Sequence, residues 1–148
     1  AFQATQDGVW DWNLETDEVF YSPRWKEMLG YKESEIESHI SAWKRLLHPD
    51  DMPRAIQFVQ EVLQRQRDYS MESRMRHQDG HYVDILSRGF PVRREAGGPV
   101  VRIVGTHFDL TERKRAEDVL REQMELFADS QRIAHIGSWR WDIEKNTV

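Results

Sequence analysis

Cysteine is absent from the 148 residues of this chain. The absence excludes disulfide bonds, thiolate nucleophiles and zinc sites built on cysteine. A protein without disulfides fits a reducing compartment, so we expect a cytoplasmic location.

Long apolar runs are also absent. No segment approaches the roughly 18 apolar residues that a membrane-spanning helix needs, so we expect no direct membrane contact. The chain begins at Ala1, and no basic stretch leading into an apolar stretch follows it. We therefore expect no signal peptide, and we interpret the chain as a piece of a longer protein.

Neither sign of charge dominates the sequence. The 21 lysines and arginines are scattered among 26 acidic residues, which gives a net charge of −5. Nucleic acid is not an expected partner, because binding it requires a concentrated basic face.

Catalytic motifs are missing as well. Neighbouring carboxylates such as Asp50-Asp51 do not converge on one substrate in a helix or a strand, so we interpret the pair as a cap for the helix that follows. Ser22 and Ser138 lack a nucleophile-elbow context. Gly97-Gly98 lack the lysine and the helix of a phosphate-binding loop. We expect no catalytic residues and no enzymatic activity in this segment.

Tryptophan, in contrast, occurs six times, and its spacing repeats. Residues 8–19 read GVWDWNLETDEV and residues 137–148 read GSWRWDIEKNTV, so the glycine, both tryptophans, the glutamate and the last valine coincide at an offset of 129. That offset is too long for a solenoid repeat and is about the length of a domain plus a linker. The tandem repeat predicts that 135–148 is the opening strand of a second, truncated copy.

Hydrophobic periodicity predicts the order strand, strand, short helices, longer helix, three strands and a final helix. Ser22-Pro23 predicts the start of a short helix, residues 52–66 predict the longer helix, and Asp79-Gly80 predicts a hairpin turn. One antiparallel sheet with helices on one face is an α+β fold. The predicted strands are 9–14, 19–21, 69–77, 81–93 and 100–108.

Two histidines, His77 and His81, stand on either side of the predicted hairpin turn and could approach each other. Two histidines without a third ligand form a poor zinc site. We therefore expect no bound metal.

From Thr111 the pattern predicts a connector helix over 111–134. Leu120, Met124 and Phe127 follow a heptad spacing for about two heptads, and we predict that they form the seam of a parallel homodimer. The alternative is that this face packs on its own domain. At the start of the helix, we predict that Thr111 is the cap and that Asp109 holds the exit by accepting backbone or arginine donors. The alternative is that both are ordinary turn and cap residues without a switching role.

Six motifs stand in order along the chain. They are Gly8-x-Trp10-x-Trp12, residues 25–31 (WKEMLGY), residues 47–51 (LHPDD), Glu72-x-Arg74, residues 79–83 (DGHYV) and residues 105–117 (GTHFDLTERKRAE). Together they resemble the PAS family, in the form with a PAC motif that is common in bacterial multidomain sensors. Tyr82 stands where a tryptophan is usual, and Leu110 stands where an isoleucine is usual.

The resemblance implies a five-stranded antiparallel sheet in the order 2-1-5-4-3, with short helices on one face, over residues 1–110. It implies a sensory module, often dimeric, that relays a ligand- or partner-induced change through its C-terminal helix to adjacent PAS and output domains of the same chain. A histidine kinase of a two-component system or a diguanylate cyclase is a usual output. The alternative is a spacer and dimerisation domain with a filled core.

The resemblance also bears on cofactors. Cysteinyl-flavin and coumarate photochemistry are excluded because both need a cysteine. Haem is disfavoured, because haem sensors of the family take their axial histidine from the long helix and residues 52–66 contain none. A non-covalent flavin or another small ligand stays open, and so does a core filled by the tryptophans. The candidate lining is Trp10, Trp12, Trp43, Met71, Met75 and Phe108, with Phe108 expected on the same strand face as Val100 and Val104.

Overall fold

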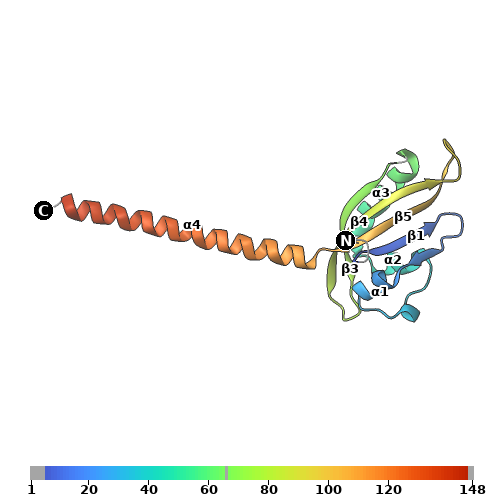
Figure 1. Cartoon of the computed structure of the whole chain (residues 1–148), viewed down its shortest axis with the longest axis horizontal. Helices are drawn as coiled ribbons and strands as arrows, with labels where there is room; N and C mark the ends of the chain where they lie inside the picture. The colour runs from blue at the N-terminus through green and yellow to red at the C-terminus, as the bar shows by residue number, and fades with distance from the viewer. Residues whose placement is uncertain (1–5, 66, 147–148) are drawn as a thin grey trace. The chain divides into compact units, whose positions relative to one another are not determined.

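The computed structural model of the protein describes residues 6–65 and 67–146. Five strands form one antiparallel sheet in the order β2-β1-β5-β4-β3 (Figure 1). The predicted α+β class and the strand order 2-1-5-4-3 are confirmed. The strands are β1 Gly8–Asn13, β2 Val19–Tyr21, β3 Tyr69–Arg76, β4 Tyr82–Arg93 and β5 Val100–Asp109.

The segment between β2 and β3 is helical, and its helices lie over one face of the sheet (Figure 1). Ser22 determines where the first helix begins, because its hydroxyl accepts the backbone N–H of Trp25 at 3.3 Å. The same hydroxyl accepts the N–H of Val9 at 2.8 Å, which joins the helix start to β1. The elements are α1 Pro23–Met28, η2 Glu33–Glu35, α2 Ile40–Leu46, η3 Pro49–Asp51 and α3 Met52–Arg65.

A row of directly paired residues crosses all five strands on the inner face of the sheet. From β2 to β3 the row reads Tyr21, Trp10, Gly105, Gly89 and Tyr69. A Cβ atom on Gly105 would collide with the Arg88 carbonyl oxygen and with the Trp10 ring, and one on Gly89 would collide with the Tyr69 ring. The two glycines therefore provide the space in which the aromatic rings lie against the sheet.

Strand β5 turns the opposite set of side chains inward from the one predicted. Because Gly105 pairs with Trp10, the odd-numbered Ile103 and His107 face the core and are 0% and 3% exposed. Phe108 is 40% exposed, so its assignment to the pocket lining is wrong. Shifting the alternation by one residue moves every side chain of a strand to the other face. Strand β5 has apolar residues at both odd and even positions, so its sequence does not reveal which set is buried.

The chain divides into two compact units, Ala1–Thr111 and Glu112–Val148. Helix α4 spans Thr111–Asn146, so the predicted strand at 135–148 is wrong for the described residues, which end at 146. A strand needs a neighbouring strand to pair its backbone groups, and residues 135–146 instead satisfy theirs within the helix. That the repeated residues belong to a second copy of the domain stays a prediction. None of the described helices is both long and apolar enough to cross a membrane.

The Asp51 carboxylate, interpreted from the sequence as a helix cap, binds strand β3 instead. It accepts the backbone N–H of Arg74 at 2.8 Å and two guanidinium N–H groups of the same residue at 2.8 and 3.2 Å. These bonds hold the pKa of Asp51 below its usual range although the carboxylate is buried. The η3 turn is capped by His48, whose Nδ1 accepts the N–H of Asp50. Asp51 therefore connects the helical layer to the sheet.

Replacing Asp51 with asparagine should lower the free energy of unfolding by about 2 kcal/mol, because the charge-assisted bonds to Arg74 weaken. The Arg74 side chain is 41% exposed, so the cost stays below that of a fully buried pair. Urea unfolding measures the change. The matched control is Asp50→Asn, at a side chain that is 80% exposed, with an expected change below about 0.5 kcal/mol. Equal losses in the two variants would contradict this role for Asp51.

Candidate functional site

A small cavity lies between the inner face of the sheet and the helices. Its free space is about 20 Å³, counted for the centre of a water-sized molecule, which is room for about one water. Sites for cofactors and drug-sized ligands measure about 300–1,000 Å³. A larger ligand would therefore have to displace side chains. The lining is mostly aromatic and aliphatic: Trp10, Trp12, Val19, Tyr21, Trp25, Ile40, Trp43, Val59, Tyr69 and His107.

Three of the six predicted lining residues, Trp10, Trp12 and Trp43, line this cavity. Met71 and Met75 are buried at 7% and 0% exposure, but they lie in the core outside the lining. Sequence reasoning missed four aromatic or imidazole rings of the lining. The alternation of β2 could have identified Tyr21, whereas the others depend on how distant segments pack. The missed rings are Tyr21, Trp25, Tyr69 and His107.

His107 is the titratable group at the centre of the site. Its ring lies 6.1 Å from the Trp10 ring in an edge-on arrangement and 5.7 Å from the Trp25 ring, measured between centroids. Burial lowers the pKa of His107 to about 3. The imidazole is therefore neutral at physiological pH and offers one hydrogen-bond donor and one acceptor.

Two indole N–H groups border the same space. Nε1 of Trp10 and Nε1 of Trp25 are buried and have no hydrogen-bond partner within the part of the chain that the structure describes. Tyr21, in contrast, is satisfied: its hydroxyl donates to the His39 carbonyl at 2.8 Å and accepts the Trp43 N–H at 3.3 Å. Burial raises the pKa of Tyr21, so its hydroxyl stays protonated. The site therefore presents neutral donors and suits an uncharged acceptor.

The exit from the sheet is held by two hydrogen bonds. The Asp109 carboxylate accepts the backbone N–H of Thr111 at 2.8 Å, which makes Asp109 the capping group and Thr111 the residue whose amide is capped. Between them, Leu110 is 1% exposed, and its N–H donates to the carbonyl of Asp84 on β4 at 2.9 Å. The geometry agrees with the backbone donor predicted for Asp109, while a switching role for either residue stays a prediction.

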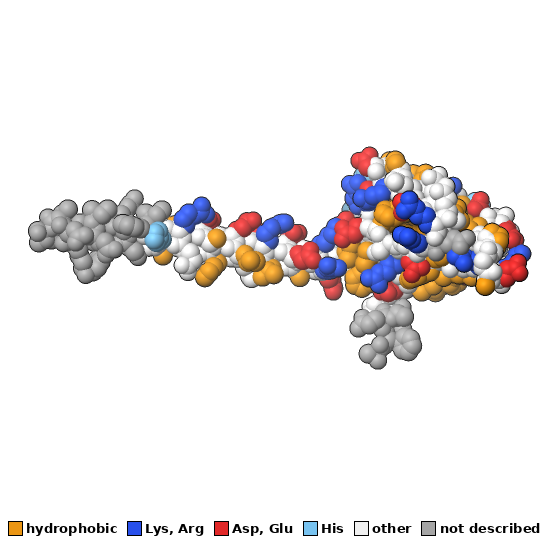
Figure 2. All heavy atoms as spheres, turned by 90° about the horizontal axis from the view of Figure 1, so that it is seen from above, with side chains coloured by type: hydrophobic (Ala, Val, Ile, Leu, Met, Phe, Trp, Pro, Cys, Tyr) orange, Lys and Arg blue, Asp and Glu red, His pale blue; other side chains and the backbone are white. Residues whose placement is uncertain are grey.

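Helix α4 carries the predicted dimer seam. The side chains of Leu120, Met124 and Phe127 are 56%, 63% and 66% exposed in the single chain. Figure 2 shows apolar side chains gathered along one side of this helix among charged ones. Exposed apolar residues at heptad spacing favour burial against another helix. The use of this seam in a dimer stays a prediction.

One protein-family model matches most of the sheet-and-helix part of the chain. A family model described as the PAS fold matches residues 18–107. Among curated proteins, the chain is 29% identical over 121 residues to the probable diguanylate cyclase DgcE of Escherichia coli (strain K12). The match covers 81% of this chain and 11% of that protein, so the chain spans about a tenth of the length of this relative.

Two solved structures are similar in both fold and sequence. The sensory box histidine kinase/response regulator from Burkholderia thailandensis E264 is 36% identical with a TM-score of 0.66, covering 82% of this chain and 90% of that chain. The N-terminal domain of a diguanylate cyclase with PAS/PAC sensor from Marinobacter aquaeolei is 25% identical with a TM-score of 0.65, covering 73% and 98%.

The buried His107 should make stability depend on pH. Its pKa is about 3 in the folded chain, against an ordinary value of 6.5, so between these values the unfolded chain binds one more proton. The stability that depends on a neutral His107 is fully present above pH 6.5 and is lost as the pH falls toward 3. The expected slope from this residue is about 1.4 kcal/mol per pH unit.

Urea unfolding between about pH 7.5 and about pH 4.5 measures this slope. The His107→Gln variant should lose stability less steeply than the wild type, because glutamine takes up no proton. The control is His135→Gln, at an exposed position of α4, which should retain the wild-type slope. Parallel curves for the wild type and His107→Gln would show that His107 is not buried in its neutral form.

Proposed function

The chain belongs to the PAS family, and from that premise we propose that it is a sensory and regulatory module of a bacterial multidomain signalling protein. The names of its relatives, a sensory box histidine kinase/response regulator and two diguanylate cyclases, support this proposal. The parent protein is a cytoplasmic sensor histidine kinase or diguanylate cyclase. This segment regulates the enzyme and contributes no catalytic residue.

The observation that carries the proposal is the corner where β5 ends and α4 begins. Leu110 is anchored to β4 through the Asp84 carbonyl, and Asp109 caps the first amide of the helix. A change in the pairing of β4 and β5 would therefore alter the cap of α4. A ligand or partner that favours one sheet geometry shifts the population of two states, and the capped helix relays that shift.

The partners follow from helix α4. Leu120, Met124 and Phe127 form the seam of a parallel homodimer, since their exposed apolar surface is stabilised by burial against a second copy. The adjacent PAS copy and the output domain of the same chain receive the change. Nucleic acid and membrane lipid are not partners of this module.

A second function, a spacer and dimerisation domain that senses nothing, is favoured by one observation. The cavity has room for about one water-sized molecule, and aromatic and aliphatic side chains surround that space. In this alternative the same α4 seam and the same corner transmit a change that begins in a neighbouring domain. The two functions differ in whether the rings around His107 move to admit a ligand.

Removing the cap at Asp109 tests the relay. In the full-length protein, Asp109→Ala should change the basal output of the enzymatic domain several-fold, because loss of a cap costs about 1 kcal/mol, a factor of about 5 in a two-state equilibrium. Asp109→Asn should retain the wild-type output, because asparagine caps equally well. Kinase or cyclase assays at matched protein levels measure the change.

Glu112→Ala is the control. Glu112 is exposed and directly follows Thr111, and the variant should leave the output near the wild-type level. If Asp109→Ala and Asp109→Asn both gave the wild-type output, the corner would carry no signal.

The dimer seam is tested by a pair of identical substitutions on one helix. Leu120→Asp should convert the dimer to a monomer in light scattering at high concentration, because it places a charge in the apolar seam. Leu126→Asp lies off the seam at a similar exposure, 67% against 56%, and should leave the dimer intact. A monomeric wild type, or equal dissociation of both variants, would refute the seam.

A further inference from the structure

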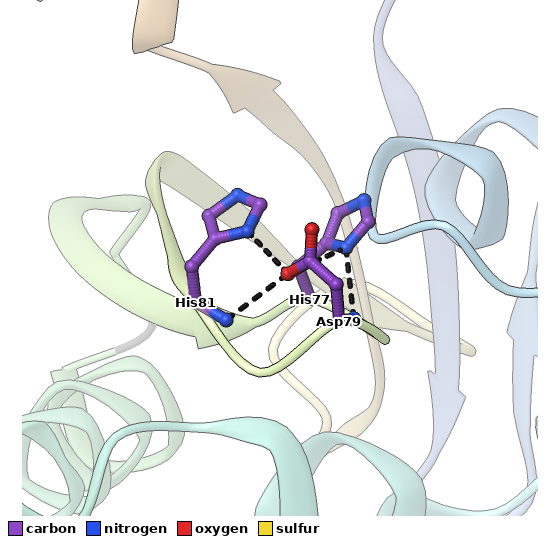
Figure 3. Close-up of side chains that lie close together, drawn as sticks. All are labelled: His77, Asp79 and His81. Atoms are coloured by element: carbon purple, nitrogen blue, oxygen red, sulfur yellow. Dashed lines mark hydrogen bonds and ion pairs between the residues drawn. The ribbon is translucent and has the colours of Figure 1, made fainter.

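The turn between β3 and β4 brings together three side chains that can bind a metal ion. His77, Asp79 and His81 each place one ligand atom within 4.8 Å of the others (Figure 3). The Asp79 and His81 side chains are 59% exposed, and that of His77 is 26% exposed. The pair of histidines that the sequence left without a third ligand therefore has one, a carboxylate from the turn itself.

The two histidines direct the same ring atom toward one point. Nδ1 of His77 lies 3.2 Å from Oδ1 of Asp79, and Nδ1 of His81 contacts the same oxygen (Figure 3). The two rings face each other with centroids 4.6 Å apart and planes inclined by 19°. An ion held at about 2.0–2.2 Å from each ligand would lie near this point, with the exposed carboxylate drawn back toward solvent.

One hydrogen bond prepares a histidine for this role. Nδ1 of His77 accepts the backbone N–H of Asp79 at 3.2 Å, an arrangement that belongs to the neutral ring with its proton on Nε2. Neutral imidazole is the form that binds metals. A metal ion would take the Nδ1 lone pair in place of the hydrogen bond.

The turn is held in place by contacts with the end of helix α1. A Cβ atom on Gly30 would lie only 2.5 Å from Cε1 of His77, so the imidazole ring packs directly over that glycine. The N–H of Gln78 donates to the Leu29 carbonyl at 2.9 Å, and the N–H of His77 donates to the His81 carbonyl at 2.7 Å. Ligands on a preorganised turn need less ordering when an ion binds.

We propose that the β3–β4 turn binds a divalent first-row transition metal ion through His77, Asp79 and His81. Two imidazoles and one carboxylate match Zn²⁺ and Cu²⁺, and water completes the coordination. Mg²⁺ and Ca²⁺ prefer all-oxygen ligands and do not bind here. The bound ion stabilises the turn against α1, since a ligand that binds only the folded chain raises its stability.

Titration calorimetry with Zn²⁺ alone, on the untagged chain, tests the site. The wild type should bind one ion, and His81→Ala should bind it roughly tenfold or more weakly, because even changes beyond the ligands cost about 10–100-fold. Asp79→Asn should weaken binding in the same way; it retains a side-chain oxygen for the turn bond that Asp79 Oδ1 accepts from the His81 N–H. His135→Ala, at an exposed histidine outside the turn, should bind like the wild type.

Thermal unfolding without metal verifies that each variant is folded, and at the same Zn²⁺ concentration the wild type and His135→Ala should be stabilised more than His81→Ala and Asp79→Asn. Equal Zn²⁺ affinity in the wild type, His81→Ala and Asp79→Asn would overturn the proposal, as would equal binding of Zn²⁺ and Mg²⁺. Failure of the wild type to bind Zn²⁺ at millimolar concentration would overturn it as well.

Discussion

Two glycines, Gly89 and Gly105, pair with each other at the centre of the sheet, and an aromatic residue pairs with each of them from the next strand. Trp10 and Tyr69 occupy the space that a Cβ atom would otherwise need. Strand register and aromatic packing therefore require one another, because a slip of one residue would place side chains where the rings lie and turn the core face outward. The helices pack on the surface that these rings form.

The same packing determines what the cavity can do. Trp10 and Trp25 enclose His107 so closely that it stays neutral, and free space of about 20 Å³ remains. The indole N–H groups of both tryptophans have no partner among the described residues, and a buried donor without a partner costs about 1–3 kcal/mol. The core thus combines a filled interior with polar groups that an acceptor could satisfy, which is why sensing and spacing are both compatible with this fold.

Local patterns in the sequence predicted much of the architecture. Period-2 alternation located the strands, Ser22-Pro23 marked the start of α1, and Asp79-Gly80 marked the β3–β4 turn, because each of these depends on residues close together in the chain. Two of the predicted residues that line the cavity, Trp10 and Trp12, follow from the same kind of pattern, because they alternate within one strand. The predicted strand at 135–148 failed because a strand depends on a neighbour, which no local pattern supplies.

The sequence by itself determined the order and type of the elements up to α4 and the family they resemble. Only the tertiary structure decided which face of β5 is buried, that Asp51 binds Arg74 on β3, and that His107 lies at the cavity. These features join residues far apart in the chain, and their geometry is set by strand register and helix packing. Caps, turns and periodicities arise between near neighbours, so the sequence reveals them directly.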